Sequence, residues 1–266
     1  MSDVSLELQR APRESNGGTR WRGFVLPIVA IAVWWILTRD VQGGHGIVVS
    51  PAQVLHTAIE QARSGALVRA MSASLARELT GFVIGTSLGL ALGALLGVSK
   101  IADRAIAPSF NTFKQVSLFA WIPLISVWFG LGDVAKVVFL SLAALVPVVV
   151  HTSDGIRNVP PRLLEVARAY RYNRLQTLAY VVLPAALPTI FTGVYLALIY
   201  SWLATLGAEY LLVAGSGIGN TLVDGSGQFR MDLVLFGVIV VGITGWALNA
   251  LARAIQHRYF GSRGSI

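Results

Sequence analysis

Five arginines and only two acidic side chains lie between two strongly apolar runs, in residues 154–188. The basic side chains are Arg157, Arg162, Arg168, Arg171 and Arg174, and the acidic ones are Asp154 and Glu165. Apolar residues recur at roughly helical spacing over residues 161–180, and the prolines at 160 and 161 suit a helix start. The pattern predicts an amphipathic helix or helix pair on a membrane surface. A positive-inside loop that only sets the topology has the same composition, so composition leaves both interpretations open.

Glu165 is the residue of this segment whose side chain could make the most specific contact with a partner. Its carboxylate can accept charge-assisted hydrogen bonds from basic or backbone donors of a partner. It can equally pair with Arg162 or Arg168 on its own helix, where an exposed pair contributes only about 0.3–0.5 kcal/mol. A docking role and a surface ion pair therefore predict different effects of charge reversal at this position.

Several common kinds of chemistry have no motif in this sequence. There is no G-x-x-x-x-G-K-[ST] phosphate loop, so the chain is not expected to bind ATP. There is no H-E-x-x-H motif, the four histidines are scattered and cysteine is absent, so neither a metal site nor thiol chemistry is expected. No G-x-S-x-G nucleophile elbow lies near the end of an apolar run. A membrane-embedded hydrolase is therefore only a distant alternative.

Six apolar runs flank and position the basic segment and its Glu165. Several of them reach about 20 residues, which is long enough to cross a bilayer as helices. They are residues 21–37, 72–98, 108–129, 133–152, 181–206 and 231–253. The chain is 55% hydrophobic and 13% charged, whereas a soluble domain is nearer one quarter charged. We therefore expect an all-α, polytopic membrane protein with about six transmembrane helices. Because the arginines gather beside the apolar runs, the net charge of +8 does not predict a nucleic-acid partner.

The distribution of basic residues predicts the orientation and the division of the chain. Fifteen of the 21 lysines and arginines fall in segments that six spans would place on one side. Basic residues favour the cytoplasmic side, so both termini are expected there. The prediction is a cytoplasmic tail over residues 1–20, a membrane domain over residues 21–258 and a second cytoplasmic tail over residues 259–266.

Three further patterns concern the connections and the packing of the spans. Residues 51–70 are amphipathic and predict a helix at the outer surface or an exposed connecting helix. Small residues recur every four positions in the second run, at Gly81, Gly85, Gly89, Gly93 and Gly97. Such a row lets another helix approach closely. Residues 207–230 are glycine-rich and predict an outer loop, either plain or re-entrant. Glu78 is expected to pair with Arg77 beside it or to extend to the surface.

The central segment also resembles a known motif. Glu165-Val166-Ala167 followed by Leu183-Pro184 is similar to the EAA motif of permease subunits of ABC importers. The resemblance implies that the segment around residues 155–180 forms coupling helices that dock on a cytoplasmic ATPase. The residues implied in coupling are Glu165, Ala167, Arg168, Tyr170, Arg171, Leu183 and Pro184. Arg171 stands where the family usually has glycine, which would permit a positive φ at little cost.

Two other stretches resemble the sulfonate, taurine and nitrate branch of that family. One begins at Trp121-Ile-Pro-Leu and runs on through Trp128-Phe-Gly-Leu-Gly-Asp. The other is Gly207-Ala-Glu209, followed by Gly217-Ile-Gly219. The resemblance covers about residues 50–258, and it departs at Ser117, where relatives often carry proline.

The resemblance implies a type I permease subunit in the bacterial inner membrane, surrounded by lipid and paired as a homodimer. It implies two ATPase subunits inside, which carry ATP and magnesium, and a periplasmic or lipoprotein substrate-binding protein outside. The implied substrate is a small organic anion such as an aliphatic sulfonate or taurine. Nitrate or a thiamin-precursor pyrimidine are the alternatives for the same role.

Four residues are candidates for the translocation pathway. Trp121, Trp128 and Phe129 could line it, or could face lipid as belt aromatics. Pro123 between them would bend the helix inward, which favours the pathway. Glu209 is the fourth candidate, and it could instead contact the binding protein or cap the helix before the glycine-rich segment.

Overall fold

The structure is a computed structural model that describes residues 19–38 and 48–260. The predicted tails at residues 1–20 and 259–266 lie almost wholly outside these residues. In the described part the chain is helical and contains no strand. Its elements are α1 (Thr19–Thr38), α2 (Pro51–Arg63), α3 (Ala66–Val98), α4 (Lys100–Phe113), η2 (Leu118–Trp121), α5 (Ile122–Phe129), α6 (Asp133–Arg157), α7 (Pro161–Ala169), α8 (Arg174–Thr177), η3 (Leu178–Val182), α9 (Leu183–Leu211), α10 (Ile218–Gly227) and α11 (Met231–Phe260).

Four stretches of helix in the described residues are long and apolar enough to cross a membrane. They are Ala66–Val98, Asp133–Arg157, Arg174–Leu211 and Met231–Gln256, and a bent pair, α4 with η2 and α5, could form a fifth. Within α1, the apolar helix Ile28–Thr38 is shorter than these four stretches. The polytopic all-α prediction is confirmed, whereas the count of about six spans stays a prediction.

The third predicted span, residues 108–129, is wrong as a single helix. The axis turns by 92° between α4 and the helix that follows it. The break falls at residues 114–117, where Gln115 and Val116 donate to carbonyls three residues back and Ser117 is extended at φ −55° and ψ 133°. Pro123, which we expected to bend this span, instead lies in the first turn of α5. The bend therefore precedes the proline and lies between Phe113 and Leu118.

The glycine row of α3 packs against α6 of the same chain. A Cβ built on Gly89 would stand 2.8 Å from the Cβ of Val148, and one on Gly93 would stand 2.7 Å from the Cβ of Thr152. Contacts this short do not occur between real side chains, so each glycine is needed for close approach. The row therefore holds α3 and α6 together, and α6 packs in turn on α9.

The amphipathic stretch at residues 51–70 is divided between two helices. α2 begins with a capping box, in which Ser50 and Gln53 exchange side-chain and backbone hydrogen bonds of 3.3 and 2.9 Å. It ends at Arg63, and Gly65 has a φ of +70° before α3 starts. Val54 packs α2 on α11, so α2 is a packed connecting helix.

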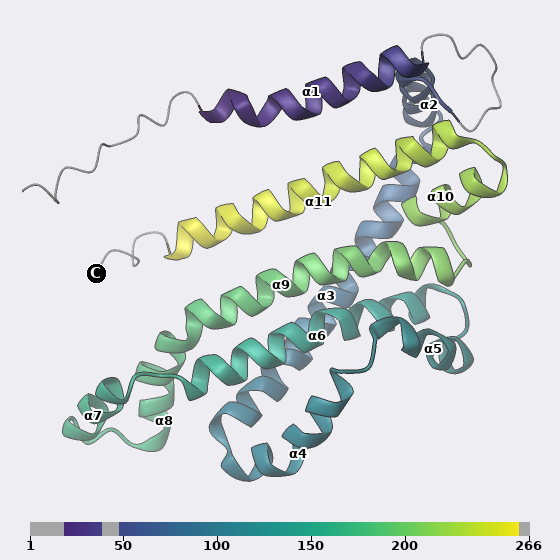
Figure 1. The fold of residues 1–266 in the computed structure, drawn as a ribbon. Coiled ribbons are helices and arrows are strands. Elements are labelled where there is room, and N and C mark those ends of the chain that lie inside the picture. The colour runs from purple at the N-terminus through teal and green to yellow at the C-terminus, as the bar shows by residue number, and fades with distance from the viewer. Residues whose placement is uncertain (1–18, 39–47, 261–266) are drawn as a thin grey trace, which may run out of the picture.

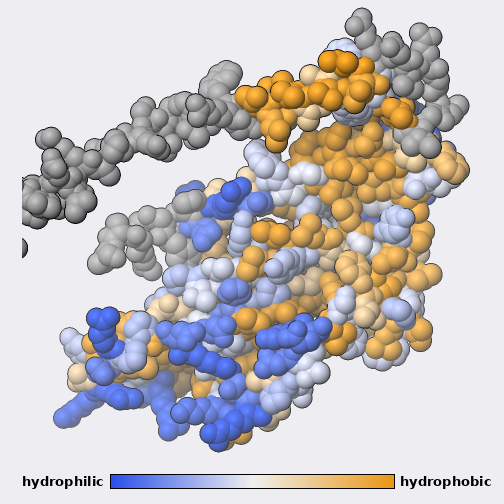
Figure 2. Space-filling view, in the orientation of Figure 1, coloured by the Kyte–Doolittle hydropathy of each residue, from blue (hydrophilic) through white to orange (hydrophobic). Residues whose placement is uncertain are grey.

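The two ends of the bundle differ in character. In Figure 1, α7 and α8 lie at one end of the long helices, and α5 and α10 lie at the other. Figure 2 shows that hydrophilic residues gather at the α7–α8 end, whereas the opposite end is mostly hydrophobic. The predicted glycine-rich outer loop is wrong in part, because α9 extends to Leu211 and residues 218–227 form α10.

Candidate functional site

The basic segment forms two short helices joined by a tight turn, which we call the α7–α8 segment (residues 161–177). The N–H of Tyr172 donates to the carbonyl of Ala167 at 3.0 Å, and that of Arg171 donates to Arg168 at 2.9 Å. These two bonds form a Schellman motif, which requires a left-handed residue after the helix. Arg171 is that residue, with φ +55°. The backbone thus keeps the conformation expected for glycine, although arginine occupies it.

A second cap starts α8. The side chain of Asn173 accepts from the N–H of Gln176 at 2.8 Å, and the amide oxygen of Gln176 accepts from the N–H of Asn173 at 2.9 Å. From Arg174 the helix continues without a break through the π-helical turn η3 into α9, as far as Leu211. Leu183 and Pro184 lie in this continuous stretch, whereas the other predicted coupling residues precede it, in α7 and the turn that follows α7.

The predicted coupling residues divide into exposed and buried ones. Glu165 and Arg168 are exposed, whereas Ala167 is 1% exposed, since α7 packs against η3. Among the described residues Glu165 forms no ion pair with Arg162 or Arg168. Its carboxylate is therefore available to a partner in this conformation. The proposed coupling role itself stays a prediction.

Aromatic residues give this surface an apolar centre that sequence reasoning missed. The rings of Tyr170 and Tyr172 lie 6.1 Å apart, and those of Tyr172 and Tyr180 lie 6.2 Å apart. Tyr170 is 72% exposed and Tyr180 is 70% exposed. Such aromatic residues are enriched at protein interfaces. The α7–α8 segment therefore combines exposed charge with exposed aromatic surface.

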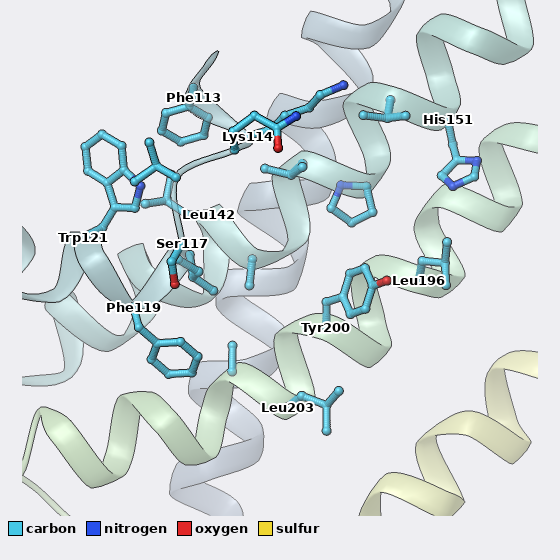
Figure 3. Close-up of a pocket in the computed structure, with 18 residues that line it drawn as sticks. Phe113, Lys114, Ser117, Phe119, Trp121, Leu142, His151, Leu196, Tyr200 and Leu203 are labelled. Atoms are coloured by element: carbon cyan, nitrogen blue, oxygen red, sulfur yellow. The ribbon is translucent and has the colours of Figure 1, made fainter. Parts of the chain in front are cut away.

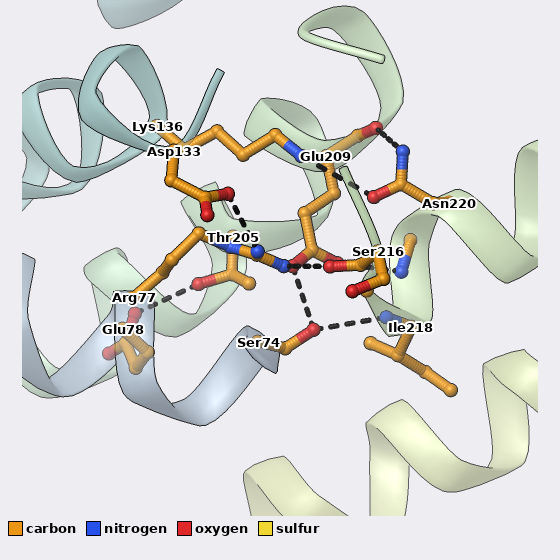
Figure 4. Close-up of polar contacts among 12 residues, drawn as sticks. Ser74, Arg77, Glu78, Asp133, Lys136, Thr205, Glu209, Ser216, Ile218 and Asn220 are labelled. Atoms are coloured by element: carbon orange, nitrogen blue, oxygen red, sulfur yellow. Dashed lines mark hydrogen bonds and ion pairs between the residues drawn. The ribbon is translucent and has the colours of Figure 1, made fainter. Parts of the chain in front are cut away.

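At the opposite end of the bundle lies a buried cluster of charges, the Arg77–Glu209 network. Its members are Ser74, Arg77, Asp133, Lys136, Glu209 and Asn220, shown in Figure 4. Arg77 forms ion pairs with Glu209 at 2.5 Å and with Asp133 at 2.9 Å. Arg77, Lys136 and Glu209 are buried, whereas the side chain of Asp133 is 66% exposed. The buried charge of Arg77 is compensated by Glu209 inside the cluster and by Asp133 at its surface, as buried charges require.

The network fixes α10 to the bundle. The carboxylate of Glu209 accepts from the N–H of Gly219 at 2.7 Å and from the hydroxyl of Ser74 at 2.7 Å. The hydroxyl of Ser74 in turn accepts from the N–H of Ile218 at 3.0 Å. Both N–H groups belong to the first turn of α10 and have no partner within that helix. Glu209 therefore caps α10, and not the helix before the glycine-rich segment that the sequence suggested.

Lys136 completes the attachment from α6. Its ammonium donates to the carbonyl of Ala214 at 2.7 Å and to the amide oxygen of Asn220 at 3.4 Å. Asn220 also donates to the carbonyl of Val213 at 2.9 Å. Asp133 and Lys136 were not among the predicted site residues, although charges at the start of an apolar run were the signal available.

Glu78 does not pair with Arg77, contrary to expectation. Its carboxylate is fully buried and accepts hydrogen bonds from the hydroxyls of Ser201 at 2.6 Å and Thr205 at 2.8 Å. The two side chains of adjacent residues point to different partners because successive positions on a helix diverge by about 100°. Glu78 therefore joins α3 to α9 rather than extending to the surface.

A pocket of about 570 Å³ opens between η2 with its preceding linker, α6 and α9, as Figure 3 shows. Trp121 lines it, whereas Trp128 and Phe129 do not and are 67% and 45% exposed. Glu209 is 1% exposed, lies in the network and does not line the pocket. Of the four pathway candidates, only Trp121 lines this pocket, and the pathway roles of all four stay predictions.

The fold is that of a helical membrane protein, and comparisons with known proteins place the chain in a family of membrane permeases. Residues 85–261 match the family model described as binding-protein-dependent transport system inner membrane component. The chain belongs to this family and is a multi-pass inner-membrane protein. The fold is also similar to that of the MetNI methionine ABC transporter in an inward-facing conformation, with a TM-score of 0.56 and 24% identity. That similarity covers 71% of this chain and 95% of the other.

Its relatives include permeases named for sulfonates. The chain is 33% identical over 263 residues to the aliphatic sulfonates transport permease protein SsuC of Bacillus subtilis, which covers 96% of this chain and 93% of that protein. It is 34% identical over 238 residues to SsuC of Escherichia coli, covering 87% and 88%. Permeases named for nitrate, taurine and bicarbonate transport also match, over 60% or 61% of this chain.

Proposed function

We propose that this chain is the membrane-spanning subunit of an ATP-driven importer and that its α7–α8 segment docks on a cytoplasmic ATPase. The observation that carries the proposal is the exposed basic helix pair at one end of an apolar bundle. It lies where the sequence resembles the EAA motif, and Glu165 forms no ion pair with any residue that the structure describes. In this role the chain is not itself an enzyme, and ATP and magnesium sit on the ATPase subunits.

The continuous helix from Arg174 to Leu211 supplies the mechanical connection. Movement of α8 on ATPase closure would displace α9 as a unit, because no loop separates them. The far end of α9 carries Glu209, which holds α10. ATPase closure at one end would therefore be transmitted to the opposite end of the bundle, as switching between inward and outward access requires.

The remaining parts of the assembly follow from this orientation. The α7–α8 end and both termini would be cytoplasmic, and the α10 end would face a soluble or lipid-anchored substrate-binding protein outside. Two copies would pair to enclose the pathway, and the many exposed apolar side chains elsewhere would contact lipid or the second copy.

The substrate we propose is a small organic anion such as an aliphatic sulfonate or taurine. The names of the relatives that cover most of this chain support it. Nitrate and bicarbonate are the alternatives that other relatives support. A thiamin-precursor pyrimidine, the remaining alternative, has no support among these relatives.

Charge reversal at Glu165 tests the docking role. In mild detergent, Glu165→Lys should release a co-purifying ATPase and stop transport while the permease still inserts normally. A reversed charge at a contact typically costs several kcal/mol, which is enough to release a partner of micromolar affinity. Asp224→Lys is the matched control, because Asp224 is an exposed acid at the opposite end and should leave ATPase retention unchanged. If Glu165→Lys retains the ATPase with full transport, the α7–α8 segment does not dock through this residue.

A further inference from the structure

Several polar side chains line the pocket described above, and no function has been assigned to them. Basic side chains from two different elements line it: Lys114 from the end of α4 and His151 from α6. Neutral polar groups of Gln115, Ser117 and Tyr200 add hydrogen-bonding capacity. None of the described residues that line the pocket is an aspartate or a glutamate. The lining thus carries a net positive charge.

The rest of the lining is apolar, and part of it lies opposite Lys114 and His151. Figure 3 shows Lys114 and His151 along one side of the pocket, with Phe119 and Leu203 along the opposite side. Ligand pockets commonly have this composition, mostly apolar walls with a few polar groups that fix orientation. A ligand that satisfies both sides must combine an acidic head group with a hydrocarbon part.

We propose that this pocket is a binding site for a small amphipathic organic anion, in which Lys114 holds the acidic head group and the apolar side holds the hydrocarbon part. This inference rests on the proposed import of an organic anion and adds the position at which the membrane subunit itself selects for charge. A compact ammonium group suits a sulfonate, because it offers three donors to oxygen acceptors. The imidazole of His151 offers a further donor from the same side of the pocket.

A second explanation of Lys114 makes a different prediction. Lys114 is also the C-cap residue of α4, where a cation interacts favourably with the helix dipole. On that explanation its charge stabilises the helix end and has no effect on what enters the pocket. The two explanations differ in whether the charge of Lys114 changes the reactivity of a group inside the pocket toward charged reagents.

The chain contains no cysteine, so a single introduced thiol can report on the pocket. We would place it with Ser117→Cys, because Ser117 is exposed and lines the pocket. The full-length chain in membranes would be treated with a thiosulfonate reagent that carries a sulfonate and, separately, with one that carries a trimethylammonium group. The ratio of the two rates measures the preference of the pocket for anions.

The site predicts that Lys114→Met lowers this ratio about tenfold, because a positive charge on the pocket lining acts in opposite directions on the two reagents. Lys114→Arg should keep most of the preference. Lys100→Met is the matched control, since Lys100 starts the same helix, roughly 20 Å away along its axis. An unchanged ratio in Lys114→Met would overturn the proposal, and so would an equal loss in Lys100→Met.

Protection by ligand tests the apolar side. Millimolar hexanesulfonate should slow modification of the Ser117→Cys thiol severalfold, and hexyltrimethylammonium should not. Equal protection by both, or none by either, rules out an amphipathic anion site. Uptake of hexanesulfonate by the assembled importer in proteoliposomes separates this from the proposed function. If the rate ratio depends on Lys114 but hexanesulfonate is not taken up, the anion site is supported and the proposed substrate is rejected. If hexanesulfonate is taken up but the rate ratio does not depend on Lys114, the proposed substrate is supported and the anion site is rejected.

Discussion

Arg77 of α3 and Glu209 of α9 are 132 positions apart in the chain and form a buried ion pair with a nitrogen–oxygen distance of 2.5 Å. Removing one partner leaves the other charge buried and uncompensated, which typically costs about 3–5 kcal/mol. We expect Arg77→Met to lower the thermal unfolding temperature strongly in detergent. Glu209→Gln should lower it less, because the amide oxygen can still accept from Gly219.

The double variant and an exposed pair provide the controls for this prediction. The double variant with Arg77→Met and Glu209→Gln should be destabilised by less than the sum of the two single variants. In the double variant both charges of the pair are removed, so neither partner's charge is left alone. Asp103→Asn breaks the ion pair of Asp103 with Arg157, whose side chains are 33% and 38% exposed, and should cost less than about 1 kcal/mol. Strict additivity in the double variant would show that the pair is not coupled.

The turn after α7 should be more stable with glycine than with arginine at position 171. A left-handed conformation costs an L-residue roughly 1–2 kcal/mol, and glycine adopts it freely. We expect Arg171→Gly to slow amide hydrogen exchange in residues 166–173, while Arg171→Val accelerates it. Arg168→Gly is the control, because it places glycine inside α7 and should destabilise by about 1 kcal/mol. Faster exchange in Arg171→Gly would show that the arginine side chain stabilises the turn more than its backbone strains it.

Gly89→Leu should disrupt the contact between α3 and α6. The added side chain would overlap Val148, and overpacking of this kind costs about 1–3 kcal/mol or more. The yield of folded permease and its unfolding temperature would measure the effect. Gly242→Leu is a matched control on a long apolar helix, because a Cβ there meets nothing within 4 Å. Equal effects of both substitutions would contradict the close packing at Gly89.

Both termini should be reached only from the cytoplasmic side. Cysteines at Ser2 and Ser265, which lie outside the described residues, would be the only thiols in the chain. A membrane-impermeant thiol reagent added to intact cells should label neither, and should label both after the cells are opened. Labelling of either one from outside would overturn the orientation on which the docking proposal depends.

Local patterns in the sequence were enough to predict the class of protein, most long helices and the helical α7–α8 segment. Apolar runs of about 20 residues are helical in a bilayer because each backbone group must be bonded within its own segment. The glycines at every fourth position of α3 likewise predicted close helix packing from a local pattern. The EAA-like residues marked the α7–α8 segment, and the caps at Asn173 and Gln176 explain why it forms two helices rather than one.

Only the tertiary structure decided which distant groups meet. Nothing near Arg77 in the sequence indicates Glu209, and nothing near Glu78 indicates Ser201 and Thr205, because these pairs form only after α3 and α9 have packed. The bend at residues 114–117 likewise brings Lys114 and Trp121 to one pocket with His151 of α6. Helix formation depends on neighbouring residues, whereas a pocket and a buried charge pair depend on how whole helices are placed against one another.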